Sequence, residues 1–179
     1  MKSTKFLMQE HKLILRALDV LDNMASWAEK NGSVDEVDSG TILDFLRWFA
    51  DAHHQAKEET ILFPALKRAV AAQNRPVEHM MLEHEQERAL IAQIETAVRL
   101  ARMPEFLSCV NKLSWTLRNH IYKEDDILFE FIKTALKPDV DDAVTALLEK
   151  FDTNLDKEIL SEKISHLRSL EWKYLRRTS

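Results

Sequence analysis

Apolar residues recur every three or four positions along four long stretches of the chain, which is the spacing of a helix with one buried face. These stretches span residues 4–30, 39–72, 76–102 and 104–137. Turn-forming residues separate them, among them Gly32, which can cap a helix end, and Pro104, which suits a first helical turn. Because short connections favour antiparallel neighbours, we predict an all-α protein with an antiparallel up-down-up-down four-helix bundle over residues 1–138.

The remaining residues, 139–179, predict a C-terminal helical extension. An apolar stripe runs through this extension from Leu160 to Tyr174. Such a stripe needs a surface to cover. We therefore expect it to pack either on the bundle or on a second copy of the chain, in which case the protein forms a homodimer.

The composition narrows the class of protein. The chain has 179 residues, of which 45% are hydrophobic and 31% charged, enough for a packed core in a single domain. Its two glycines are too few for a β-sandwich or a glycine-rich nucleotide-binding loop. A net charge of −5 argues against a nucleic-acid partner, and a single cysteine, Cys109, argues against disulfides and cysteine-based metal sites. No stretch is apolar enough to span a membrane, so we expect a cytoplasmic protein without a membrane partner.

A histidine interrupts each of the four apolar stripes, and two of these histidines are followed one turn later by a glutamate. The six residues are His11, His54, Glu58, His84, His120 and Glu124. Residues four apart on a helix point the same way, so each histidine–glutamate pair shares one face. At a rise of ~1.5 Å per residue, the distances from the helix ends place all four histidines at nearly one level of the bundle.

Polar groups on buried stripes need partners. Each buried polar group without one costs on the order of 1–3 kcal/mol, against a total stability of ~5–15 kcal/mol, so something must compensate the whole set. A metal centre does so directly. The donors are too many for one tetrahedral zinc ion and suit two ions bridged by the carboxylates, with iron or manganese favoured and zinc possible.

An internal repeat supports two matching halves of a site. The segment HQAKEETILF at residues 54–63 recurs as HIYKEDDILF at residues 120–129, and the dipeptide Glu-His occurs at 10–11 and again at 83–84. The repeat suits a centre with a pseudo-two-fold axis and two metal ions. Lys57 and Lys123 lie beside the repeated glutamates, so the alternative interpretation of each pair is an ion pair on the surface.

These motifs resemble those of the hemerythrin-like HHE cation-binding family over residues 4–137, through HHQAKEETILFPAL, NHIYKEDDILFEFI and the two Glu-His dipeptides. The resemblance implies a four-helix bundle that holds a non-haem di-iron centre. The implied metal ligands are His11, His54, Glu58, His84, His120 and Glu124. It further implies that Glu58 and Glu124 bridge the two ions.

One departure from the oxygen-carrying hemerythrins bears on function. Those proteins have a fifth histidine one turn from the ligand on the third helix, where this chain has Met80 and Arg88. One ion should therefore keep an open position unless Glu87 fills it. Asp125 is an alternative ligand to Glu124, because its spacing from His120 matches the aspartate of the oxygen carriers.

The charged neighbours of these residues are assigned smaller roles. His53 is expected near the site or in solvent, with coordination in place of His54 as the alternative. Glu10 and Glu83 could support the ligands, although their spacing does not indicate it. Glu59, Asp125 and Asp126 are expected on a solvated face.

The open position favours a non-enzymatic di-iron protein that binds or senses oxygen, nitric oxide or peroxide, or that holds iron for delivery. The alternative is a di-iron enzyme, namely an oxidase or peroxidase, a nitric-oxide-handling protein or a repair factor for iron–sulfur clusters. A structural bundle with a vestigial centre is a third possibility. No residue pattern selects a substrate, so whether the protein is an enzyme stays open.

Overall fold

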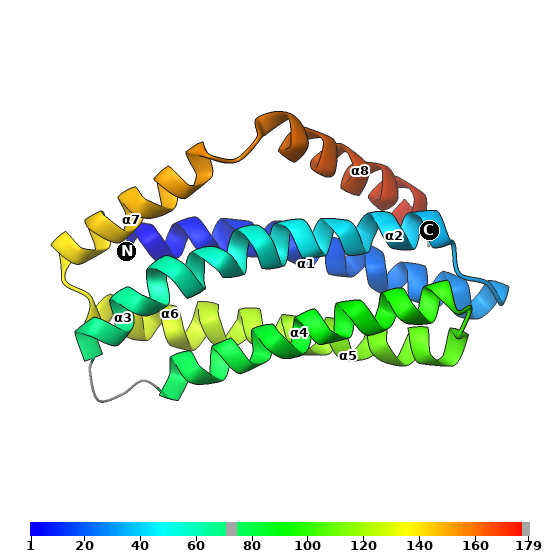
Figure 1. Cartoon of the computed structure of the whole chain (residues 1–179), viewed down its shortest axis with the longest axis horizontal. Helices are drawn as coiled ribbons and strands as arrows, with labels where there is room; N and C mark the ends of the chain where they lie inside the picture. Colours follow the sequence, from blue (N-terminus) through cyan, green and yellow to red (C-terminus); the bar gives the residue numbers. More distant parts are fainter. Residues whose placement is uncertain (71–74, 177–179) are drawn as a thin grey trace.

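The computed structural model describes residues 1–70 and 75–176, and within these ranges the chain is helical with no strand (Figure 1). The first rod is α1 (Lys2–Asn31), and the second comprises α2 (Glu36–Phe45), η1 (Leu46–Gln55), η2 (Glu58–Leu62) and α3 (Phe63–Val70). The third is α4 (Arg75–Arg99), and the fourth comprises α5 (Met103–Lys123), η3 (Glu124–Leu128) and α6 (Phe129–Ala135). Two further helices, α7 (Pro138–Thr153) and α8 (Lys157–Leu175), complete the described chain. The all-helical class predicted from the sequence is confirmed.

Local signals mark several helix ends. Gly32 closes α1 in the left-handed conformation with φ of 71°, and its N–H donates to the carbonyl of Ala28. The side chain of Asp35 caps α2 by accepting a hydrogen bond from the backbone N–H of Asp38 at 3.0 Å. Pro104 lies in the first turn of α5. The predicted end of the second helix at Ala72, the break after it and the last residues of the tail lie outside the described residues.

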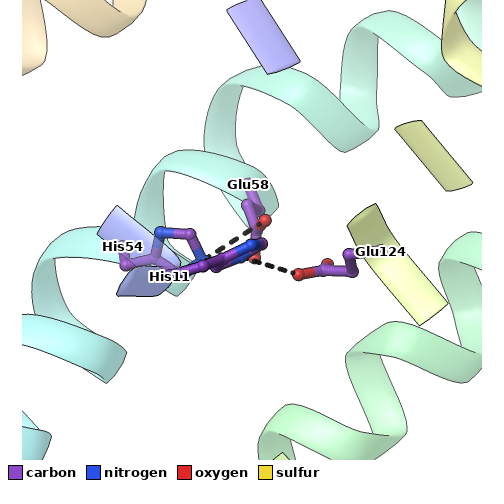
Figure 2. Close-up of side chains that lie close together, drawn as sticks. All are labelled: His11, His54, Glu58 and Glu124. Carbon is purple, nitrogen blue, oxygen red and sulfur yellow. Dashed lines mark hydrogen bonds and ion pairs between the residues drawn. The ribbon is translucent and has the colours of Figure 1, made fainter. Parts of the chain in front are cut away.

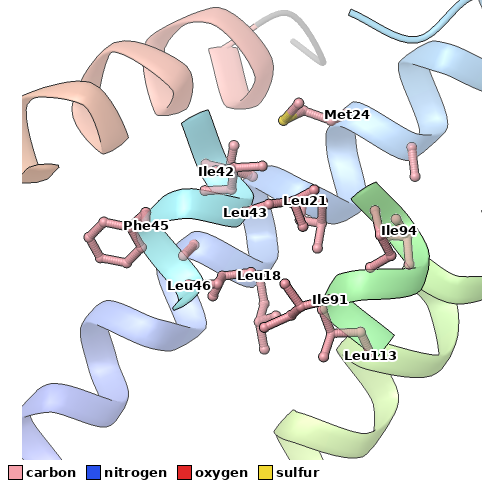
Figure 3. Packing of buried hydrophobic residues seen from close by; sticks show 14 of the residues in the cluster. Leu18, Leu21, Met24, Ile42, Leu43, Phe45, Leu46, Ile91, Ile94 and Leu113 are labelled. Atoms are coloured by element: carbon pink, nitrogen blue, oxygen red, sulfur yellow. The ribbon is translucent and has the colours of Figure 1, made fainter. Parts of the chain in front are cut away.

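The four rods lie side by side along the long axis of the molecule (Figure 1). α4 packs along α5, α1 packs against both α2 and α5, and α2 also packs against α4. Their buried residues form two apolar clusters. One contains Leu18, Leu43, Ile91 and Leu113, and Figure 3 shows these side chains converging from α1, α2, α4 and α5. The other contains Leu7, Leu62, Met80 and Leu128.

The predicted histidines occupy the layer between the two clusters. Along α1, His11 lies between Leu7 of one cluster and Ile14 of the other. The order of the clusters alternates from each rod to the next, because the second and fourth rods begin in the first cluster whereas α1 and α4 begin in the second. The polar layer is therefore enclosed by apolar side chains on both sides.

The second and fourth rods have wider π-type turns at equivalent places in the repeat. η2 covers Glu58–Leu62, and η3 covers Glu124–Leu128. Pro64 follows η2, but the matching position after η3 is Glu130, so the proline is not required for this turn. Turns of this kind are concentrated at functional sites. Both η2 and η3 begin at the glutamate of a histidine–glutamate pair, whereas η1 ends one residue after His54.

The C-terminal helices lie against the rods. α7 packs on α1 and η2, and α8 packs on α1 and α2. Leu167, Leu170 and Tyr174 of the predicted stripe are buried there. The hydroxyl of Tyr174 donates a hydrogen bond to Asp38 at 2.6 Å. Among the described helices, none has both the length and the apolar character that a membrane crossing requires.

Candidate metal centre

Six buried side chains from the four rods meet in the polar layer. They form two groups, each with donor atoms within 4.8 Å of one another. One group is His11, His54, Glu58 and Glu124, and the other is His84, His120, Glu58 and Glu124. Figure 2 shows the first group, in which His11 and His54 approach the two glutamates from separate helices. The structure thus brings together all six residues that the sequence singles out, and both groups share the two glutamates.

The donor atoms face one another at short range. Nε2 of His11 lies 2.9 Å from Nε2 of His54, and Nε2 of His84 lies 3.1 Å from Nε2 of His120. The carboxylate oxygens of Glu58 and Glu124 lie 3.2–3.5 Å from these nitrogens. All four of these oxygens are buried and have no hydrogen-bond partner. Buried carboxylate oxygens without partners are costly, and a cation between them and the imidazoles would satisfy them, so these residues fit a metal ion.

The other ring nitrogen of each histidine is held by a carboxylate from a neighbouring helix. Nδ1 of His11 lies 2.8 Å from Asp125, Nδ1 of His54 lies 2.8 Å from Glu10, Nδ1 of His84 lies 2.7 Å from Glu59, and Nδ1 of His120 lies 3.0 Å from Glu83. Because a carboxylate only accepts, Nδ1 donates in each case, so Nε2 is the nitrogen that can offer a lone pair to a metal ion once its own proton has left. Metal-binding histidines are oriented in this way.

The sequence predicted that Glu59, Asp125 and Asp126 lie on a solvated face. This prediction is correct for Asp126, which is exposed, but it is wrong for Glu59 and Asp125, which contact buried histidines. Glu10 and Glu83, for which the spacing indicated no support, also contact histidines. Each of the four acids is adjacent in sequence to a candidate ligand, but it contacts the candidate ligand of another rod. The repeat contained the signal, since Glu10 corresponds to Glu83 and Glu59 to Asp125.

Cations hold three of these carboxylates in turn. Arg88 donates to Glu59 at 2.6 Å and to Asp51 at 2.7 Å. Arg88 is one of the two residues, with Met80, that lie one turn from His84, where the sequence lacks a fifth histidine, and here it supports His84 through Glu59. Lys57 forms an ion pair with Glu10, and Lys123 forms one with Glu83.

His53 lies outside both four-residue groups and is buried beside the site, in line with the first of the two placements that the sequence left open for it. Its Nε2 lies 3.2 Å from Glu10 and 3.2 Å from Asp152 of α7. These three residues form a third group with metal-ligand spacing. The amine of Lys57 contacts all three, so a cation already occupies the middle of this group.

Glu87 is buried near the centre without belonging to either group. One carboxylate oxygen accepts a hydrogen bond from Gln55 at 2.6 Å, and the other has no partner. Burial raises the pKa of Glu87, although the charges of His120 and His84 oppose the rise. Glu87 lies one turn after His84 on α4, close enough to the second pair of histidines for their charges to affect its pKa.

The carboxylates also shift the pKa values of the histidines. Burial lowers the pKa of His11, but contacts with Asp125 and Glu124 outweigh burial and raise it to about 10. Burial likewise opposes the effect of Glu58 and Glu59 on His84, whose pKa rises to about 9. The carboxylates of the layer therefore favour positive charge on these imidazoles.

Comparison with known proteins agrees with this geometry. A sequence profile of the Hemerythrin HHE cation binding domain matches residues 2–132, which contain both groups of candidate ligands. No curated protein has significant similarity to the chain. Proteins with this domain bind metal cations, and the match covers well over half of the chain. The chain therefore belongs to the hemerythrin HHE cation-binding domain family.

Proposed function

We propose that this protein holds a non-haem di-iron centre whose open coordination position binds or senses a small ligand, namely oxygen, nitric oxide or peroxide, or that it holds iron for delivery. The proposed iron ligands are His11, His54, Glu58, His84, His120 and Glu124, with Glu58 and Glu124 shared by both ions. The observation that carries the proposal is the set of four buried glutamate oxygens without hydrogen-bond partners between four imidazole nitrogens.

The donor set favours iron or manganese over other metals, and zinc remains a possible occupant. Each group offers two imidazoles and two shared carboxylates. Four protein donors leave room at an ion that prefers five or six. When bound, such an ion supplies a Lewis-acidic position at which a diatomic ligand or peroxide can attach.

The remaining residues of the layer shape this site. The four carboxylates at the Nδ1 atoms fix the histidine tautomers and direct Nε2 toward the centre. Phe129 stacks on the ring of His11 at 5.8 Å, and Phe63 stacks on that of His84 at 5.9 Å. These rings restrict the entry of water from the side of the second apolar cluster.

One residue supports the alternative of a di-iron enzyme. Glu87 is buried one turn after His84 on α4, and burial raises its pKa, which shifts the carboxyl group toward the protonated form. A protonated carboxyl group at this place can donate a hydrogen bond, or a proton, to a ligand at the open position. Such a donor suits reactions of oxygen or peroxide, which take up protons, better than the binding of nitric oxide.

The wider organisation is proposed along with the site. The alternating order of the two apolar clusters supports an up-down-up-down bundle over residues 1–138, with residues 139–179 as an extension. A cytoplasmic location, a homodimer and the lack of nucleic-acid or membrane partners stay predictions from the sequence.

The proposal is tested by reconstituting the purified protein with ferrous iron without oxygen, followed by metal analysis. We expect two iron ions per chain, and optical and Mössbauer spectra that change on exposure to oxygen or nitric oxide. Absence of bound iron or manganese would contradict a metal centre. If the protein binds two ions but its spectra do not change with oxygen, nitric oxide or peroxide, the open position is contradicted and iron storage is favoured. Multiple turnovers of peroxide or nitric oxide would favour the enzyme.

A further inference from the structure

Lys57 is an unusual neighbour for a cation site, because its side chain is fully buried. The amine forms an ion pair with Glu10, lies 3.0 Å from Nε2 of His53 and lies 3.0 Å from Asp152. Glu10 uses its other oxygen to accept the hydrogen bond from His54. A continuous chain of contacts therefore runs from Asp152 on α7, through Lys57 and Glu10, to a candidate metal ligand.

The second half of the repeat lacks this arrangement. Lys123 corresponds to Lys57, and it pairs with Glu83, which holds His120. The side chain of Lys123 is 27% exposed, however, whereas that of Lys57 is 0% exposed. Water can screen the charge of Lys123, but only protein groups can compensate the charge of Lys57.

The local charge count explains why Asp152 matters for a metal ion. Lys57 and Glu10 together are neutral, and Asp152 makes the cluster negative. Without Asp152, Glu10 would be the one carboxylate left to pair with the buried ammonium, and this pairing would reduce the negative charge that Glu10 offers to His54. A less negative partner makes an imidazole a weaker metal ligand. Asp152 thus compensates the charge of Lys57 in the way that solvent compensates the charge of Lys123.

We propose that the C-terminal extension completes the metal centre, with Asp152 acting as a positioning residue for His54 through Lys57 and Glu10. The inference rests on the proposed metal function. Asp152 lies outside residues 2–132, which match the family domain. The extension would thereby compensate the charge of Lys57 in the half of the centre that contains His54, whereas water compensates the charge of Lys123 in the other half.

The test compares wild-type protein with Asp152→Asn, using Asp142→Asn as the matched control. Asp142 also lies on α7, and it pairs with Lys2 at 2.8 Å on the exposed surface, far in sequence from Lys57. Cobalt(II) affinity is measured by competition with a chelator. Direct partners of ligating histidines are worth ~10–100-fold in affinity, so we expect a smaller loss of about three- to tenfold for Asp152→Asn and none for the control.

A second readout separates positioning from simple docking of α7. In the cobalt-loaded protein, the imidazole N–H protons give shifted NMR signals, and Glu10→Gln assigns that of His54. Asp152→Asn should move this signal and leave that of His120 in place, while Asp152→Glu should restore it. If Asp152→Asn changes neither the cobalt(II) affinity nor the His54 signal, the role of Asp152 is overturned while the proposed metal centre stands. Equal effects of Asp152→Asn and Asp142→Asn would have the same consequence. Failure of the wild-type protein to bind metal would overturn the proposed function as well.

Discussion

Glu10 accepts a hydrogen bond from Nδ1 of His54 at 2.8 Å, although the two residues are 44 positions apart and Glu10 directly precedes a different histidine. The same exchange occurs in the second half of the repeat, where Glu83 precedes His84 but contacts His120 at 3.0 Å. Each acid thus links two rods at the polar layer. Together with the contacts of Asp125 and Glu59, these hydrogen bonds between rods fix the orientation of all four imidazole rings.

The carboxylate partner of His84 should affect metal binding strongly. We expect Glu59→Gln to weaken the binding of one metal ion by about 10–100-fold, because the amide is a poorer acceptor for Nδ1 and also loses its ion pair with Arg88. Chelator competition with ferrous iron measures the effect. Asp126→Asn, at an exposed position of the matching segment, should leave the affinity unchanged. Equal affinities for both variants would refute the supporting role of Glu59.

A shared glutamate should be needed for the second ion. Glu58 belongs to both groups of candidate ligands, so Glu58→Gln removes a charged donor from each. We expect fewer than two iron ions per chain and loss of the spectroscopic signature of a coupled pair. Glu130→Gln, an exposed glutamate in α6, serves as the control. Retention of two coupled ions by Glu58→Gln would contradict the bridging assignment.

Glu87 should influence the reaction of the centre more than its metal content. We expect Glu87→Gln to keep two iron ions, because Glu87 is in neither group of candidate ligands. The amide cannot supply a proton, so the reaction of the ferrous protein with peroxide should slow by about 10²-fold or more. Stopped-flow absorbance measures this rate. If the variant instead loses an ion, Glu87 is a ligand rather than a proton donor.

The stability of the metal-free protein should depend on pH through the histidines. The pKa values of His11 and His84 rise from 6.5 to about 10 and about 9 in the folded chain. A raised pKa stabilises the folded state fully below the unfolded value, and this contribution is lost as the pH rises through the folded value. Urea unfolding of the metal-free protein should therefore show decreasing stability from about pH 6.5 to pH 10.

Metal binding should have the opposite pH dependence. Protons on the imidazoles must leave before a cation binds, so the affinity for ferrous or cobalt(II) ions should rise with pH over the same range. The loaded protein should accordingly gain stability over the metal-free form as the pH increases. Parallel pH profiles for the two forms would show that the histidines do not exchange protons for metal.

The docking of α8 should contribute to stability without affecting the centre. The hydroxyl of Tyr174 donates to Asp38 of α2, and hydrogen bonds to charged groups are worth about 1.5–3 kcal/mol. We expect Tyr174→Phe to lower the free energy of unfolding by about that amount and to leave iron binding intact. Tyr122→Phe, at an exposed tyrosine, should change neither. A loss of iron from Tyr174→Phe would mean that the docking of α8 also supports the centre.

Periodicity and the repeat predicted much of what the structure contains. The rods begin and end near the expected residues because Gly32 and Pro104 act locally. The meeting of His54 and Glu58 with their counterparts follows from helical spacing together with a common level along the bundle. Both inferences depend only on short-range geometry, which a single sequence contains.

The contacts around the ligands depend on packing between helices, which the sequence did not reveal. Lys57 beside Glu58 suggests a surface ion pair, yet its side chain is fully buried and pairs with Glu10 and with Asp152 of α7. Its partner Asp152 lies 95 positions away. Likewise, Glu59 contacts His84 of another rod, and it lies in the π-type turn at Glu58–Leu62, which the apolar pattern does not indicate.

The position of α7 matters for truncated forms of this protein. A fragment that stops where the family profile stops, at residue 132, retains every candidate ligand but lacks Asp152, the second carboxylate partner of Lys57. Such a fragment would present an ammonium group to solvent beside its first histidine pair. Affinities and spectra recorded on it would describe a more symmetric centre than the one proposed for the 179-residue chain.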